Sequence, residues 1–136
     1  MSQSSDAAPR HQQRERALSL LYEAEMKRLQ PLEVADALAV PPDPYVLALL
    51  AQVESTQVEA DRRIAEAAIG WPLDRLAVVD RQVLRLAVAE LLDPHGPPVA
   101  VVINEAVELA KTYSTEESGR FVNGILSTVA ADVRGA

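Results

Sequence analysis

The chain has 136 residues, enough for one domain with a single core, and its 49% hydrophobic and 24% charged residues are typical of a globular protein. It contains no cysteine, which excludes disulfides, thiolate metal sites and a cysteine nucleophile. The formal net charge of −7 argues against a general affinity for nucleic acid, but residues 1–22 carry three arginines against two acidic residues. The basic charge is therefore local, near the start of an acidic chain.

Alanine, leucine, glutamate and valine are frequent, and no stretch alternates apolar and polar residues as a strand does, so the sequence predicts an all-α fold. No apolar run is long enough to span a bilayer, and the first residues contain no hydrophobic signal segment. We therefore expect a cytoplasmic protein without membrane contact. Residues 1–8 are expected to be a disordered tail, and residues 9–136 a single helical domain.

An amphipathic helix is expected over residues 9–29, and its apolar stripe consists of Leu18, Leu21, Tyr22 and Leu29. At about 100° per residue, Arg10, His11 and Arg14 fall on nearly the same azimuth as this stripe. The stripe thus changes from apolar to basic toward the start of the helix, where the helix dipole adds positive potential. These side chains should lie at the rim of the core.

Three more helices are expected before residue 70. Residues 31–40 form a short amphipathic helix, and the next helix covers residues 44–54, with Asp43 as N-cap and Pro44 as its first residue. Thr56 and Glu59 have the spacing of a capping box. This spacing predicts a break near residue 55 and a separate helix ending near residue 68, with Val58 facing inward.

Residues 73–92 form the longest nearly unbroken apolar segment of the chain. Two adjacent apolar stripes predict a helix that is buried over most of its circumference, at the centre of the domain. The β-branched residues before Asp80 indicate a short turn ahead of the main helix. Asp80, Arg81 and Arg85 occupy the remaining polar sector, and the simplest interpretation of Asp80 and Arg81 is the exposed edge of a buried helix.

Two helices are expected after the proline-rich loop at residues 94–98: one over residues 99–112, and a last one whose apolar pattern runs from Phe121 to Val133. Ser114 and Glu117 have capping-box spacing, which makes Ser114 the expected N-cap of the last helix. Gly124 interrupts that helix at a cost of about 1 kcal/mol relative to alanine, which the close approach of another helix would explain.

Little in the sequence has the spacing of a catalytic or metal site. His11 and His95 have no partner at a metal-ligand spacing, and Glu105 with Glu108 is best interpreted as a solvated helix face. Phe121, like Tyr22, is by default a core aromatic. The residues alone predict a binding domain that is not an enzyme, has no metal and no cofactor, and carries a basic helix end; they do not identify the ligand.

Three segments give the chain a specific resemblance: RHQQRERALSLLYEAEM (10–26), WPLDRLAVVDRQVLRLAVAELL (71–92) and PVAVVINEAVELAKTYSTEESGRFVNGILSTVA (98–130). In their order, their spacing and the F-V-N-G at 121–124, they resemble the NusB family of bacterial transcription antitermination factors. The resemblance implies an all-α fold of about seven helices in two small bundles, and no catalysis. It also implies binding to the boxA element of ribosomal RNA leader transcripts, together with NusE (ribosomal small-subunit protein ten) in the RNA polymerase antitermination complex.

By this resemblance, the expected RNA-binding residues are Arg10, His11, Gln12, Arg14, Tyr22, Arg85, Arg120 and Phe121. The expected partner-binding residues are Asp80, Arg81 and Glu117. Single-stranded RNA would be bound by stacking and by contacts with base edges. Many family members have consecutive arginines where this chain reads RHQQR at 10–14. Fewer charges release fewer counterions, so weaker RNA binding and a greater dependence on NusE are expected.

Two other functions fit the same residues. A similar domain is fused to ribosomal RNA cytosine methyltransferases, which would make this chain an accessory domain, although the sequence shows no methyltransferase domain. Alternatively, the chain is a self-associating module, a homodimer whose RNA surface is masked by its own second copy. Size-exclusion chromatography with and without NusE distinguishes the self-associating module from the antitermination factor.

Overall fold

The computed structural model describes residues 9–135, so the expected tail at 1–8 lies outside the described residues, as does residue 136. Residues 9–135 form six α-helices and one 3-10 turn, with no strand among them, which confirms the all-α prediction. No helix in this part of the chain has the length and apolarity needed to cross a membrane. The elements are α2 (Pro9–Lys27), α3 (Pro31–Asp36), α4 (Pro44–Ala67), η1 (Leu73–Arg75), α5 (Val78–Leu92), α6 (Val99–Tyr113) and α7 (Glu116–Arg134).

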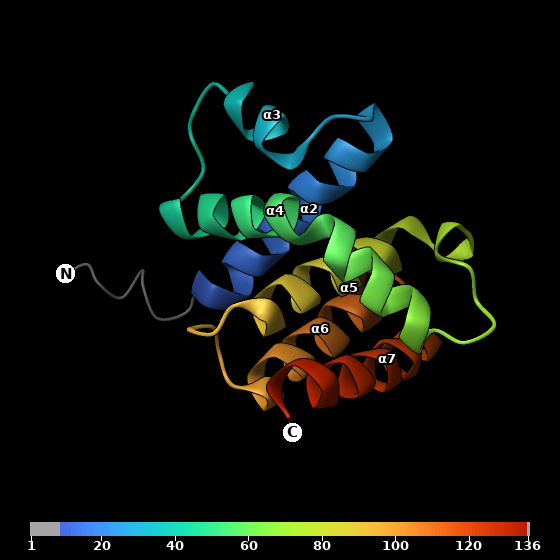
Figure 1. Cartoon of the computed structure of the whole chain (residues 1–136). Coiled ribbons are helices and arrows are strands. Elements are labelled where there is room, and N and C mark those ends of the chain that lie inside the picture. The colour runs from blue at the N-terminus through green and yellow to red at the C-terminus, as the bar shows by residue number, and fades with distance from the viewer. Residues whose placement is uncertain (1–8, 136) are drawn as a thin grey trace.

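Helix α5 lies in the middle of the molecule (Figure 1). It packs against α2 and α4 from one bundle and against α6 and α7 from the other, while α3 covers α2 and α4. Every residue from Gln82 to Leu91 is buried, which confirms the prediction from the double apolar stripe. The short turn expected before the main helix is η1.

Helix α4 is continuous from Pro44 to Ala67, so the predicted break near residue 55 is wrong. The hydroxyls of Ser55 and Thr56 donate hydrogen bonds to the carbonyl of Gln52, at 3.2 and 2.7 Å, instead of capping a new helix. Hydroxyls that bond back onto the preceding turn often bend a helix, and α4 changes direction about halfway along in Figure 1. Val58 is consequently 88% exposed, not inward-facing.

The N-cap of α7 is Thr115, one residue beyond the predicted Ser114. The Thr115 hydroxyl accepts a hydrogen bond from the backbone N–H of Ser118 at 3.0 Å, whereas Ser114 ends α6 as its C-cap. The explanation offered for Gly124 also fails, because a Cβ there would meet nothing within 4 Å. The close approach occurs at Gly119, where a Cβ would lie 2.9 Å from Cγ of Lys111.

The apolar stripe of α2 is buried only in its middle part. Leu18 and Leu21 are in the core, but Tyr22 and Leu29 are each 42% exposed, contrary to the expectation for the stripe. The helix ends at Lys27, and Arg28 adopts a positive φ of 57° that turns the chain toward α3. That turn takes Leu29 off the helix face, and α3 ends at Asp36, earlier than predicted.

Candidate nucleic-acid and protein interface

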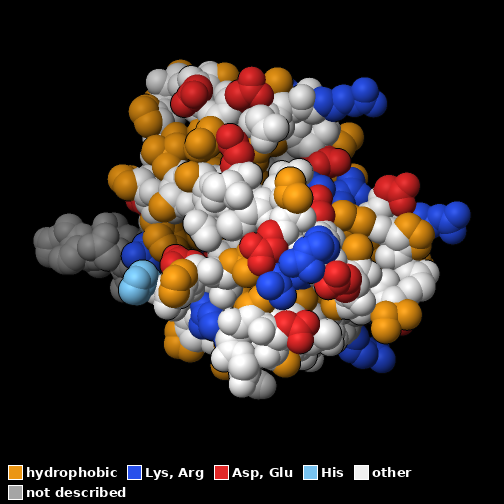
Figure 2. All heavy atoms as spheres, viewed as in Figure 1, with side chains coloured by type: hydrophobic (Ala, Val, Ile, Leu, Met, Phe, Trp, Pro, Cys, Tyr) orange, Lys and Arg blue, Asp and Glu red, His pale blue; other side chains and the backbone are white. Residues whose placement is uncertain are grey.

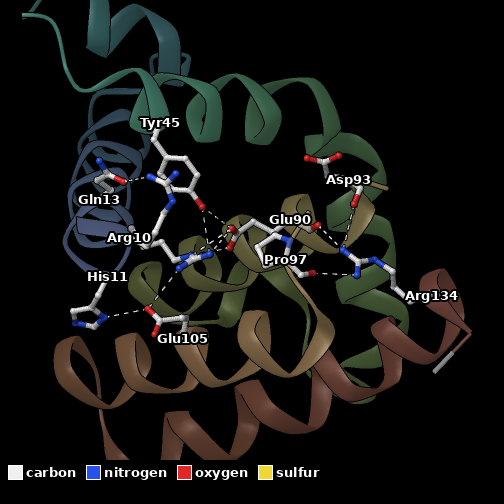
Figure 3. A network of polar contacts seen from close by, with 10 residues as sticks. Arg10, His11, Gln13, Tyr45, Glu90, Asp93, Pro97, Glu105 and Arg134 are labelled. Carbon is white, nitrogen blue, oxygen red and sulfur yellow. Dashed lines mark hydrogen bonds and ion pairs between the residues drawn. The ribbon is translucent and has the colours of Figure 1, made fainter. Parts of the chain in front are cut away.

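A buried ion pair joins the start of α2 to the end of α5. Arg14 and Glu90 have side chains only 5% and 6% exposed, and the guanidinium donates to both carboxylate oxygens, with Nη2 3.0 Å from Oε2. The Tyr45 hydroxyl from α4 lies 3.3 Å from Arg14 Nη2, and Glu105 from α6 lies 3.8 Å from Nη1. Burial alone would lower the pKa of Arg14, but its bonds to Glu90 outweigh that effect and raise the pKa. Four helices therefore meet at one permanently charged arginine, whose partners Tyr45, Glu90 and Glu105 are labelled in Figure 3.

Arg10 lies on the surface one turn before Arg14. Its guanidinium carbon sits 3.7 Å from the centroid of the Tyr45 ring, a cation–π contact, and its Nη1 donates to Gln13 at 2.7 Å (Figure 3). Burial, followed by the nearby Glu90 carboxylate, raises the pKa of Tyr45, so the ring under Arg10 stays neutral. Arg10 has no carboxylate partner among the described residues and is available to an external anion.

His11 and Gln12 are also exposed at the start of α2. His11 Nδ1 lies 3.1 Å from Glu105 and Nε2 lies 3.6 Å from Glu15. The bond to Glu105 raises the pKa of His11 above 6.5, against a smaller opposing effect of burial. The predicted basic end of α2 is therefore split, because Arg10, His11 and Gln12 face solvent while Arg14 is enclosed.

A second charged cluster fixes the polar sector of α5. Arg85 binds Asp61 of α4 through Nε at 2.8 Å and Glu25 of α2 through Nη1 at 3.0 Å, and Arg81 binds Glu25 at 2.9 Å. Burial would raise the pKa of Glu25, but its bonds to the two arginines lower the pKa overall. The expectation of an exposed edge is wrong for Arg81, whose side chain is 11% exposed, and Arg85 beside it is 10% exposed. In isolation the polar sector looked solvated, but α2 and α4 supply its counter-charges.

Surface charges on α4 are paired locally. Arg62 with Glu66 and Arg63 with Glu59 form i,i+4 pairs at 3.2 and 3.0 Å. Figure 2 shows basic and acidic side chains beside one another over the second half of α4. Such exposed pairs contribute little and leave no single-sign patch on this face. This face is therefore a poor candidate for a phosphate-binding surface.

A groove of about 500 Å³ opens where the first turn of α5 meets the first turn of α7. Trp71 and Phe121 form part of its wall, with their ring centroids 6.3 Å apart and their planes at 70°. Trp71 is 55% exposed, so a large part of its apolar ring surface is not covered by the rest of the described chain. The groove is lined by Trp71, Arg75, Leu76, Ala77, Asp80, Thr115, Glu117, Ser118, Arg120 and Phe121.

Asp80 lies at the base of this groove and is only 8% exposed, so the expected exposed edge is wrong for it as well. Its Oδ2 accepts a hydrogen bond from the Ser118 hydroxyl at 2.9 Å, which ties α5 to α7. Oδ1 is buried and has no hydrogen-bond partner. The groove therefore combines aromatic surface, two arginines and a largely buried carboxylate.

The structure brings together part of the predicted site. Asp80, Glu117, Arg120 and Phe121 all line the groove, although they come from two segments of the sequence. The exposed side chains at the start of α2 lie near Glu90, at the other end of α5, which is about 15 Å farther along the helix axis. The expected residues thus form three groups, at the start of α2, in the groove, and at the cluster of Arg81 and Arg85 with Glu25. Tyr22 is 42% exposed on α2 and does not line the groove.

Trp71 and Arg75 belong to the groove but were not among the predicted site residues. Trp71 is the single tryptophan of the chain and stands beside Pro72, outside any helical apolar pattern. The sequence did contain a signal for Trp71: an aromatic residue in a turn, where no apolar stripe of the core requires it, indicates a role in binding. Among residues 9–135, no group of three or more His, Asp or Glu side chains is arranged to hold a metal ion.

The NusB family model matches residues 11–131 of the chain. The chain is 46% identical over 123 residues to "Transcription antitermination protein NusB" of Acidothermus cellulolyticus, covering 88% of this chain and 85% of that protein. T. maritima NusB superposes with a TM-score of 0.82 at 35% identity, covering 91% of this chain and 92% of the other. A crystal structure of antitermination factors NusB and NusE in complex with dsRNA gives a TM-score of 0.76 at 29% identity, covering 90% and 96% of the two chains.

Proposed function

Because this chain belongs to the NusB family, we propose that it is a transcription antitermination factor that binds boxA RNA together with NusE, ribosomal small-subunit protein ten, during transcription of ribosomal RNA. The relative that superposes on it with NusE and RNA supports both partners. We infer that the chain acts by binding, within the RNA polymerase antitermination complex, and not by catalysis.

The observation that carries this proposal is the groove between α5 and α7. Single-stranded RNA is bound by stacking unpaired bases on aromatic rings, with cations along the backbone. The groove offers Trp71 and Phe121 for stacking and Arg75 and Arg120 for phosphates. Arg10, His11 and Gln12, about one α5 length away, provide a second contact for the same strand.

The roles of Arg14 and Arg85 in this proposal are internal. Each is buried and paired with carboxylates, Arg14 with Glu90 and Arg85 with Asp61 and Glu25, so neither has an uncompensated charge to offer phosphate. They hold α2 and α4 against α5, and they thereby position the exposed RNA-binding residues. Only Arg10 and the exposed Arg16 remain as cations on the first half of α2.

This arrangement implies weak binding of RNA by the isolated chain. Each phosphate contact on a single strand contributes about 0.7 to the slope of log K against log salt. With few free arginines, the RNA affinity depends on the additional surface that NusE brings. The acidic body of the chain, with its net charge of −7, favours rapid association with a basic ribosomal protein.

The partner surface is proposed to include Glu117, an exposed residue that lines the groove in the first turn of α7. Glu117→Lys should weaken association with NusE by about 1 kcal/mol or more and slow its rate. Glu116→Lys is the matched control, because Glu116 stands in the same first turn of α7 but does not line the groove. Equal effects of the two changes in calorimetry would remove Glu117 from the interface.

A titration of fluorescent boxA RNA, with and without NusE and over a series of salt concentrations, tests the function. We expect tighter binding in the presence of NusE, and a salt slope that falls by about 0.7 in Arg10→Gln. Arg62→Gln, which removes a surface arginine paired with Glu66 on α4, should leave the slope unchanged. If the chain and NusE together bind boxA no better than a scrambled sequence, the proposed function is wrong.

A further inference from the structure

The imidazole of His11 lies between two carboxylates that belong to different helices. Its Nδ1 is 3.1 Å from Oε1 of Glu105 on α6, a contact drawn in Figure 3, and its Nε2 is 3.6 Å from Oε2 of Glu15, one turn farther along α2. A neutral imidazole has one N–H, whereas the protonated ring has two. The ring therefore presents an N–H to both carboxylates only when it carries a proton.

The surroundings of His11 are acidic. The ionisable groups next to the ring, or bonded to its partners, come from α2 and α6 and are Arg14, Glu15, Glu105, Glu108 and Tyr113. Arg14 does not offset the carboxylates, because its charge is already matched by the buried Glu90. The bond to Glu105, with the charges of the three glutamates, raises the pKa of His11 above 6.5, against a smaller opposing effect of burial.

His11 is adjacent in sequence to Arg10, and both side chains are exposed at the start of α2. Arg10 and Arg16 are the exposed arginines on the first half of this helix, so a protonated His11 raises the number of exposed cations there from two to three. Charges within about 8–10 Å of a phosphate act on it even at physiological salt. The proton on His11 therefore changes how strongly this end of α2 attracts a polyanion.

Resting on the proposed RNA binding, we propose that the RNA contact at the start of α2 is regulated by the protonation of His11, so that RNA binds more tightly when the ring is charged. By linkage, a bound phosphate strengthens proton binding as much as the proton strengthens RNA binding. The free chain loses this proton above pH 6.5, and RNA moves the loss to a still higher pH. RNA affinity is therefore highest below this range and falls as the pH rises through it.

The test is a titration of fluorescent boxA RNA with the full chain and saturating NusE, from about pH 6 to about pH 9. The affinity of the wild-type protein should fall by about fivefold over this range, which corresponds to the loss of one exposed ion pair. The slope of log K against log salt should be smaller by about 0.7 at the high end, because one phosphate contact fewer is made. Size-exclusion chromatography verifies at each pH that the chain remains bound to NusE.

Substitutions of His11 separate its proton from every other titrating group in the complex. His11→Gln should bind weakly and His11→Arg tightly, and neither should show the fivefold change. The wild-type protein should match His11→Arg at the low end of the range and His11→Gln at the high end. His95→Gln is the matched control, because it removes the only other histidine, also exposed, and should keep the wild-type profile. Glu105→Gln removes the principal partner of His11 and should move the midpoint to lower pH.

Circular dichroism verifies that each variant is folded at both ends of the range. A wild-type profile that runs parallel to that of His11→Gln would overturn the inference while leaving boxA binding intact. An affinity that rises with pH, relative to His11→Gln, would also overturn it, because the charged ring would then be held away from RNA by its carboxylates. Absence of boxA binding at every pH in the presence of NusE would overturn the proposed function, and this inference with it.

Discussion

Replacing Arg14 by methionine removes one partner of a buried ion pair at little change in side-chain volume. Arg14 and Glu90 are 5% and 6% exposed, so solvent cannot compensate the carboxylate that remains. Breaking a buried pair in this way costs about 3–5 kcal/mol, most of it from the uncompensated charge. The loss is a large fraction of a typical domain stability of about 5–15 kcal/mol.

Urea unfolding followed by circular dichroism measures this loss, and the double variant identifies its cause. Arg14→Met with Glu90→Leu replaces both charges by apolar groups, and such replacements are often neutral or stabilising. We therefore expect the double variant to recover most of the stability lost by Arg14→Met. A loss below about 1 kcal/mol in the single variant, or no recovery in the double variant, would refute the buried-charge reasoning.

RNA binding by the folded double variant separates the two possible roles of Arg14. Because the charge of Arg14 is matched by Glu90, its removal should release no fewer counterions when RNA binds. The salt slope of boxA binding should therefore equal that of the wild-type protein, whereas Arg10→Gln lowers it. A slope reduced by about 0.7 in the double variant would mean that Arg14 contacts phosphate directly.

Leu86→Ala should cost about 2–5 kcal/mol in the same urea assay, because Leu86 is 2% exposed in the central helix and its loss leaves a cavity. Thr115→Ala should cost about 1 kcal/mol as the loss of an N-cap, and Ser114→Ala distinctly less; the opposite order would restore Ser114 as the cap. The lowered pKa of Glu25 means that its ion pairs stabilise the fold above its ordinary pKa of 4.5, and that this contribution is lost as the pH falls through the lowered value. Glu25→Gln should therefore cost about 1 kcal/mol at pH 7 and progressively less as the pH falls below 4.5; a loss that is independent of pH would contradict this account.

The positions of the helices and the burial of α5 could be predicted from the sequence because they depend on local periodicity. A double apolar stripe at 73–92 has no stable arrangement except at the centre of other helices, and the structure places it there. Local hydroxyl chemistry was less decisive. Thr56 has the spacing of a cap, but its hydroxyl donates to the carbonyl of Gln52 within a continuous α4. At the start of α7 two neighbouring hydroxyls could serve as the cap, and the structure has Thr115 in that role where the sequence predicted Ser114.

The candidate site depended on contacts that no local pattern contains. Arg14 meets Glu90 across 76 residues and Ser118 meets Asp80 across 38, so the sequence identified these charges without showing which would be buried and paired. Helical spacing determines the azimuth of a side chain on its own helix, but the neighbouring helices determine whether that azimuth faces water, a counter-ion or a groove. For this reason the composition and periodicity established the all-α fold and its central helix. Only the packing of α5 against α7 decided that Asp80 is largely buried in a groove that Trp71 and Phe121 also line.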